Sequence, residues 1–201
     1  ESLRKMGCFV LRPRFVLASR SPRRQALLQG LGLDLTVRPP DFDEDSVTAD
    51  TPQQLVERLA LGKAASVVQS GDGAVVIGSD TVVVLEGALL GKPRDAAQAA
   101  DMLGRLSGRA HEVYTGIALI GGGRQAVDCV VTRVFFRDLT PGEIARYIAS
   151  GEPFDKAGGY GIQGLAATMV RRIEGDYFAV MGFPLCRFSE LLRVHFGIDL
   201  L

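Results

Sequence analysis

Residues 113–137 read VYTGIALIGGGRQAVDCVVTRVFFR. Three consecutive glycines, residues 121–123, separate two runs that are rich in β-branched and aromatic side chains, 113–120 and 127–137. Such runs favour strands, and a glycine turn between them predicts an antiparallel hairpin. Elsewhere strand-like and helix-like segments alternate irregularly. We therefore expect an α/β fold with a mixed sheet flanked by helices, because a purely parallel sheet would contain no hairpin.

Capping signals and apolar patterns place the other elements around this hairpin. The predicted helices run from Ser21 to Gly30, from Thr51 to about Gln69, from Asp95 to Leu106, from Thr140 to about Ala149 and from about Leu185 to His195. Further strands are predicted at 15–18, 75–78, 81–85, about 167–173 and 178–181, with a glycine-rich loop at 158–164. In this scheme Ser79 and Asp80 lie between two strands.

The length, composition and net charge of the chain limit the classes of partner that we expect. The chain has 201 residues, 47% of them hydrophobic, and its 23 Lys and Arg balance its 23 Asp and Glu. This size predicts one domain or two tightly fused lobes. Zero net charge argues against binding a nucleic-acid polymer but leaves room for a small anionic ligand. We expect no membrane partner, since no apolar stretch is long enough to span a bilayer.

The cysteines indicate the compartment. Cys8, Cys129 and Cys186 are odd in number, far apart and without CxxC spacing. They are typical of reduced thiols, and the opening of the chain lacks the order of a signal peptide. We therefore expect a cytoplasmic protein.

Two arginines stand where a helix normally prefers acidic groups. Arg23 and Arg24 follow Ser21 and Pro22 in the first turn of a predicted helix, and Ser19 precedes them. A cation there is unfavourable by about 0.3 to 1 kcal/mol unless an anion offsets it. Free helix amides and two guanidinium groups together indicate a phosphate site. The alternative is a solvated arginine pair on a surface helix.

Two further charges lie among apolar residues. Asp80 sits between β-branched runs, where a carboxylate needs a cation, a metal or hydrogen bonds. It is a candidate general base or metal ligand, and the alternative is a turn aspartate that joins two strands. Lys63 falls on the apolar stripe of its predicted helix, so it must either extend to solvent or meet an anion.

Three loop residues carry weaker signals. Glu44 lies in an acidic turn that could be solvated or could help to hold a divalent cation. Lys92 follows a strand in a Gly-Lys-Pro turn. Gln163 stands between glycines, and its amide complements the imide N–H and carbonyl of uracil or thymine, although glycine clusters usually mean only a turn.

Six separated motifs occur in one order along the chain: ASRSPRR (18–24), DE (43–44), KA (63–64), GSDT (78–81), GKP (91–93) and DKAGGYGIQG (155–164). Together they closely resemble the Maf family of nucleoside triphosphate pyrophosphatases, over nearly the whole chain from residue 15. The segment 1–14 has no counterpart there and is assigned as an extension of unknown role, with 15–201 as a single domain.

The resemblance implies a fold similar to that of inosine triphosphate pyrophosphatase, with a central cleft, a divalent cation (Mg²⁺ or Mn²⁺) and often a homodimer. It implies hydrolysis of nucleoside triphosphates to monophosphate and pyrophosphate, in a role that cleans the nucleotide pool. Asp80 corresponds to the proton acceptor in that pattern. The other cleft residues implied are Ser19, Ser21, Arg24, Glu44, Lys63 and Lys92, and the metal ligands are left open.

Three positions, Arg23, Thr81 and Gln163, resemble the dTTP/UTP branch of the family. Ser79 departs from the Ala that is commoner there, and this puts the substrate preference in doubt more than the reaction. Two alternatives remain open. One is a nucleotide-binding regulator of cell division or septum formation with little turnover, and the other is 7-methyl-GTP or another non-standard nucleotide as substrate.

Overall fold

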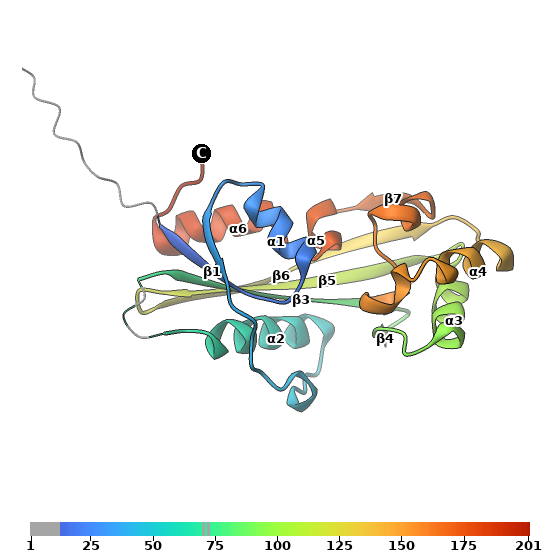
Figure 1. Ribbon diagram of the computed structural model, residues 1–201, viewed down its shortest axis with the longest axis horizontal. Helices are drawn as coiled ribbons and strands as arrows, with labels where there is room; N and C mark the ends of the chain where they lie inside the picture. The colour runs from blue at the N-terminus through green and yellow to red at the C-terminus, as the bar shows by residue number, and fades with distance from the viewer. Residues whose placement is uncertain (1–12, 70, 72) are drawn as a thin grey trace, which may run out of the picture.

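The computed structural model describes residues 13–69, 71 and 73–201. The first twelve residues of the expected extension lie outside the described residues, as does Cys8. Within the described part the strands form one seven-stranded sheet in the order β2-β1-β3-β5-β6-β7, and β4 pairs with β3 off this path (Figure 1). The strands are β1 (Arg14–Ala18), β2 (Asp34–Val37), β3 (Val75–Leu85), β4 (Ala88–Leu90), β5 (Ala110–Gly121), β6 (Arg124–Phe136) and β7 (Val170–Glu174).

The predicted hairpin is confirmed. β5 and β6 pair antiparallel over their whole length, and Gly122 and Gly123 form the turn with φ angles of 55° and 72°. Positive φ at both turn residues is the geometry that glycine favours in tight hairpins. β1 pairs parallel with β2 and β3, so the sheet is mixed as expected.

β3 corrects one prediction. The expected break at Ser79 and Asp80 does not occur, because the strand continues from Val75 to Leu85 and Asp80 pairs in register with Gly116 of β5. The backbone ladder therefore carries a carboxylate through the middle of a buried strand. Burial of this group requires a partner from outside the sheet.

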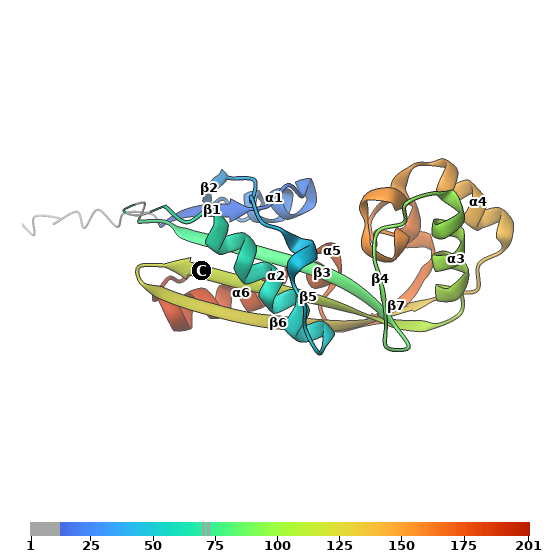
Figure 2. The same ribbon diagram turned by 90° about the horizontal axis from the view of Figure 1, so that it is seen from below.

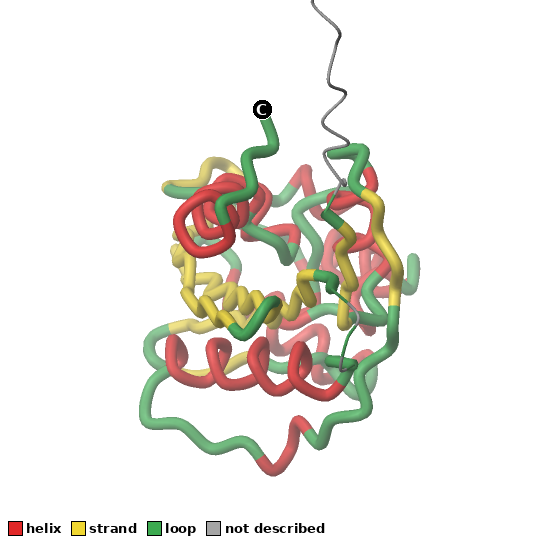
Figure 3. Tube along the Cα trace, turned by 90° about the vertical axis from the view of Figure 1, so that its left-hand side faces the viewer, coloured by secondary structure: helices red, strands yellow, loops and turns green. Residues whose placement is uncertain are grey.

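Helix α2 (Pro52–Ser66) covers one face of the sheet, and α6 (Leu185–Leu191) lies on the other face (Figure 3). Two strand glycines let α2 approach closely. A Cβ at Gly78 would lie 2.0 Å from the Ala60 carbonyl oxygen, and one at Gly116 would lie 2.3 Å from that of Val56. The close approach brings side chains of α2 directly over the centre of β3.

The remaining elements gather at the two ends of the long strands (Figure 2). The first lobe contains β1, β2, α1 (Pro22–Gln29), α2 and α6, with Phe15, Ile77 and Phe188 in its core. The second lobe contains α3 (Ala96–Leu106), α4 (Pro141–Ala149), β7 and short 3₁₀ segments between residues 152 and 168. Its core includes Leu103 and Phe136. β3, β5 and β6 run through both lobes and join them in one sheet.

The helix starts are confirmed by their caps. The side chains of Ser21, Thr51, Asp95 and Thr140 each accept a hydrogen bond from a backbone N–H in the first turn of the helix that follows. α2 ends at Ser66, short of the expected Gln69. The last helix is α6 followed by a π-helical turn, Leu192–Phe196.

Two strand predictions near the C-terminus are corrected. The expected strand at 178–181 is a short helix, α5 (Tyr177–Met181), because the Asp176 side chain caps it by accepting from the N–H groups of Phe178 and Ala179. The strand expected near 167–173 is β7, which starts at Val170 after a 3₁₀ segment, Gly164–Thr168. β2 and β4 were not expected. No helix in the described ranges has both the length and the apolarity to cross a bilayer.

Candidate active site

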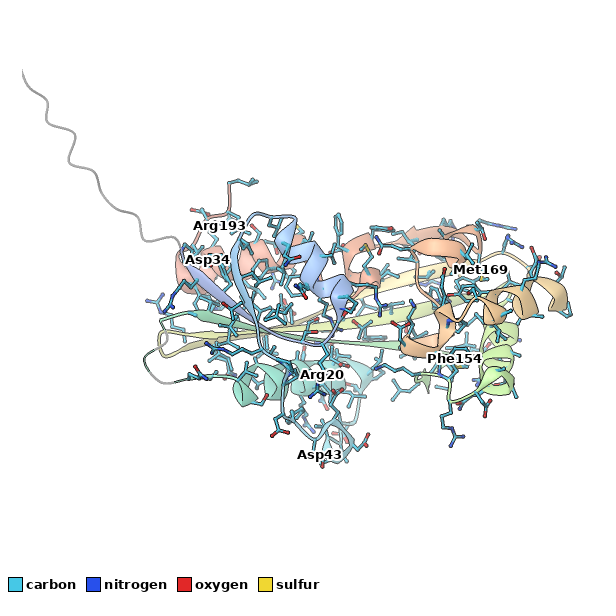
Figure 4. The ribbon with its side chains drawn as sticks, viewed as in Figure 1. Arg20, Asp34, Asp43, Phe154, Met169 and Arg193 are labelled. Carbon is cyan, nitrogen blue, oxygen red and sulfur yellow. The ribbon has the colours of Figure 1, made fainter. Side chains whose placement is uncertain are left out.

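A cavity of about 840 Å³ lies between the two lobes, beside the middle of β3. In Figure 4 the loop that carries Asp43 lies on the first-lobe side, and the 3₁₀ segment that carries Phe154 lies on the second-lobe side. The cavity is within the size range of small-molecule sites. All ten sequence-predicted site residues line it: Ser19, Ser21, Arg23, Arg24, Glu44, Lys63, Asp80, Thr81, Lys92 and Gln163.

An ion network forms the floor of the cavity. The Lys63 Nζ lies 2.5 Å from Asp80 Oδ1 and 2.8 Å from Glu44 Oε2. Lys63 and Asp80 are 6% and 8% exposed, whereas about half of the Glu44 side chain is exposed. Lys63 therefore meets anions and does not extend to solvent. Asp80 is a mid-strand carboxylate held by a buried cation, so the turn-aspartate alternative is wrong.

Phe42 seats the loop that supplies Glu44. Its ring lies over Gly62 of α2, where a Cβ would come within 2.2 Å of the ring. Only the absence of a side chain at Gly62 allows this contact. Asp43 then accepts a hydrogen bond from the Asp45 N–H and caps a 3₁₀ turn, Glu44–Ser46. The ring and the cap together hold Glu44 beside Lys63.

The two arginines occupy different environments at the start of α1. The Arg24 Nε donates to the Gly182 carbonyl at 2.7 Å, and its Nη2 donates to Thr81 Oγ1 at 3.1 Å. Burial lowers the pKa of Arg24, and the negative charge of Asp80 opposes that shift. Arg24 is thus a half-buried cation held by two acceptors, which excludes the solvated-pair alternative for it.

Arg23 reaches across the cavity. Its Nη1 lies 2.9 Å from Asp155 Oδ2 in the second lobe. The unfavourable position of a cation at a helix N-terminus is offset here by a carboxylate from the opposite lobe. Burial raises the pKa of Asp155, but hydrogen bonds from Lys156 and Arg23 outweigh this and lower it overall. Sequence reasoning did not single out Asp155, although the residue opens the last of the six motifs.

The family model described as "Maf-like protein" matches residues 14–195. The chain belongs to this family. It is 51% identical over 177 residues to a dTTP/UTP pyrophosphatase of Symbiobacterium thermophilum, with 88% of this chain and 91% of the relative covered. It is 51% identical over 188 residues to the dTTP/UTP pyrophosphatase of Moorella thermoacetica, with 92% and 96% covered.

Among solved structures, the Ham1 protein of Staphylococcus aureus shares 19% sequence identity with the chain. The TM-score is 0.45, and the match covers 62% of this chain and 72% of that one.

In this Maf-like chain, Lys92 and Gln163 line the second-lobe side of the cavity, and both are exposed. The loop that carries Gln163 is anchored on both sides. The Tyr160 hydroxyl lies 2.6 Å from His111 Nε2, and the Leu165 N–H donates to Glu152 Oε1 at 3.2 Å. Gln163 therefore lies on a loop that side-chain contacts hold at both ends. The loop is more than a simple glycine turn.

The first turn of the Maf-like α1 is built by two hydroxyls. The Ser21 side chain accepts from the Arg24 N–H, and the Ser19 side chain accepts from the Ser21 N–H at 3.0 Å. Ser19 is buried at the end of β1. These bonds shape the strand-to-helix turn, whose residues Ser19, Ser21 and Arg24 line the cavity.

Proposed function

We propose that the chain hydrolyses dTTP and UTP to the monophosphate and pyrophosphate. The observation that carries this proposal is the buried Lys63–Asp80 pair on the floor of a cavity rimmed by Arg23, Arg24 and Lys92. Such a site matches a polyanionic ligand together with a base for water. Curated relatives that are 51% identical over about nine tenths of the chain carry the name dTTP/UTP pyrophosphatase.

The proposed reaction is an attack of water on the α-phosphorus. A bond forms between the water oxygen and phosphorus, the bridging bond to the β-phosphate breaks, and pyrophosphate leaves. Lys63 contacts only Oδ1 of Asp80, so Oδ2 remains to orient the water and accept its proton. Arg24 and Lys92 offset the charge that accumulates on the phosphates.

The acidic residues suit a cation that arrives with the nucleotide. Within the described ranges, no three His, Cys, Asp or Glu side chains gather as a metal site by themselves. Mg²⁺ is commonly held by one or two carboxylates together with substrate phosphates. Glu44 has a second oxygen that Lys63 does not contact, so Glu44 would hold Mg²⁺ or Mn²⁺ together with the substrate phosphates. The cation would supply positive charge at the phosphate oxygens.

Three wider parts of the proposal rest on composition and the family resemblance: a cytoplasmic location, a homodimer and a role in cleaning the nucleotide pool. Cys129 and Cys186 are free thiols.

The test is pyrophosphate release from a panel of dTTP, UTP, CTP, ITP and 7-methyl-GTP with Mg²⁺ or Mn²⁺. We expect turnover of dTTP and UTP to exceed that of the others by at least about tenfold. Preference for another base would keep the reaction and overturn the substrate. No release from any nucleotide would contradict the enzyme assignment and favour a binding regulator.

Gln163→Ala is expected to lower the ratio of kcat/KM for UTP over CTP about three- to tenfold, because a hydrogen bond contributes about that much to discrimination. Binding of the triphosphate moiety should persist, since the arginines lie on the opposite lobe. Steady-state kinetics with the two nucleotides check this. Gln53→Ala, on the exposed side of α2, is the matched control. An unchanged ratio in Gln163→Ala would remove Gln163 from base reading.

A further inference from the structure

Thr115 of β5 is a buried hydroxyl that neither the motifs nor the proposed mechanism uses. It is 0% exposed and pairs in register with Thr81 of β3, so the two side chains lie next to each other on one face of the sheet. Their hydroxyl oxygens are 3.0 Å apart. Thr115 is therefore the direct neighbour of a residue that lines the cavity.

The direction of the hydrogen bonds follows from their partners. The Thr115 hydroxyl lies 2.8 Å from the carbonyl oxygen of Ala179 in α5. A carbonyl can only accept, so Thr115 must give its single proton to Ala179. The contact between the two threonines then requires Thr81 to be the donor, and the proton of Thr81 is committed to Thr115.

The second hydrogen bond of the Thr81 hydroxyl also has a determined direction. Arg24 Nη2 lies 3.1 Å from Thr81 Oγ1, and a guanidinium can only donate. One lone pair of Thr81 is thus occupied by Arg24 and its proton by Thr115. A threonine hydroxyl has two lone pairs, so the only group that Thr81 can offer to the cavity is its second lone pair.

We propose that Thr115 is a positioning residue that makes Thr81 an acceptor-only contact, that the ligand group facing Thr81 is ring position 3 of the base, and that this group must therefore be a donor. Uracil and thymine carry an N–H at ring position 3, where cytosine carries a lone pair; with that N–H on Thr81, Gln163 would read the neighbouring carbonyl. Thr115 would in this way favour UTP and dTTP over CTP without contacting the ligand, because it acts through Thr81. The inference rests on the proposed function and adds the source of its base preference.

The test compares the affinities of the α,β-methylene analogues of UTP and CTP, measured by calorimetry with Mg²⁺ present. The wild-type chain should bind the UTP analogue more tightly. Thr115→Val keeps the shape but removes the acceptor, which frees the Thr81 proton to turn toward the ligand. We expect the affinity ratio to fall about tenfold, by loss for the UTP analogue and gain for the CTP analogue.

Two variants control for structural effects. Thr115→Ser keeps the hydroxyl and should keep the ratio. Thr132→Val removes another buried hydroxyl, which supports the start of the same short helix by donating to the Asp176 carbonyl at 3.2 Å, and Thr132 does not line the cavity. It should also keep the ratio. If Thr115→Val does not fold, Thr115→Cys keeps a small side chain whose sulfur is a weaker acceptor than the hydroxyl, and the ratio should fall in the same direction.

Four results would overturn the proposal. Three of them are an unchanged ratio in a folded Thr115→Val or Thr115→Cys variant, an equal loss of affinity for both analogues, and a wild-type chain that binds the two analogues equally. The fourth is a fall of the same size in Thr132→Val, which would assign the effect to helix support. The analogues are not cleaved, so their affinity ratio does not depend on turnover. Absence of UTP turnover would refute the proposed hydrolysis, and the affinity ratio would still test the role of Thr115.

Discussion

Asp80→Asn is expected to lower the kcat for pyrophosphate release from UTP by about a hundredfold to ten-thousandfold, the range that a general base contributes. Asparagine has nearly the shape of aspartate but cannot accept a proton from water. Lys63 retains Glu44 at 2.8 Å, so the buried ammonium group keeps one anionic partner. Steady-state kinetics and nucleotide binding on the same preparation check the prediction, and binding should persist.

The matched control is Asp128→Asn. Like Asp80, Asp128 is a strand carboxylate that pairs with a cation, in this case Arg187. It is partly buried, lies on β6 and is outside the lining of the cavity. This variant should retain turnover. Full activity in Asp80→Asn would exclude Asp80 from the reaction, and an equal loss in both variants would assign the effect to the stability of the sheet.

The unfolding free energy is expected to fall by about 2 kcal/mol between pH 7 and pH 5 because of His111 alone. Burial lowers the pKa of His111 from 6.5 to about 4. The unfolded chain therefore binds a proton more tightly than the folded chain. The neutral histidine contributes fully above pH 6.5, and this contribution is lost as the pH falls toward 4. Urea unfolding at a series of pH values checks the slope.

Two variants isolate this effect. His111→Gln cannot titrate and should flatten the dependence between pH 7 and pH 5, a window above the ordinary pKa values of Asp and Glu. His195 is exposed at the end of the last helix, and His195→Gln should leave the slope as in the wild-type chain. Equal slopes in the wild-type chain and His111→Gln would show that His111 titrates normally. The same histidine contacts Tyr160, so acidification should also loosen the loop that presents Gln163.

Local signals predicted the elements whose formation depends on neighbouring residues. A cap such as Thr140 requires only a side-chain oxygen and an N–H three residues away, so the start of α4 could be predicted. The hairpin likewise depends on two glycines that adopt positive φ between strand-forming runs. All ten predicted site residues line one cavity. Most were singled out as charged or capping residues in unusual local positions, and the family resemblance joined these separated motifs into one site.

Prediction failed where a distant residue decides the outcome. β3 continues through Asp80 because Lys63, on a helix seventeen residues earlier, neutralises the carboxylate. The segment 178–181 is apolar enough for a strand, but Asp176 caps it as a helix. Asp155 meets Arg23 only because the two lobes face each other across the cavity.

The sequence by itself determined the mixed α/β architecture and the helix starts, because these depend on contacts within a few positions of the chain. It also indicated the residue types of the site, through motifs that lie far apart. Only the tertiary structure decided which charges neutralise one another and which way the Thr81 hydroxyl points. These depend on the approach of α2 and α5 to the sheet. A buried charge or hydroxyl takes its state from whichever partner the packing brings within hydrogen-bonding distance, and that partner lies far away in the sequence.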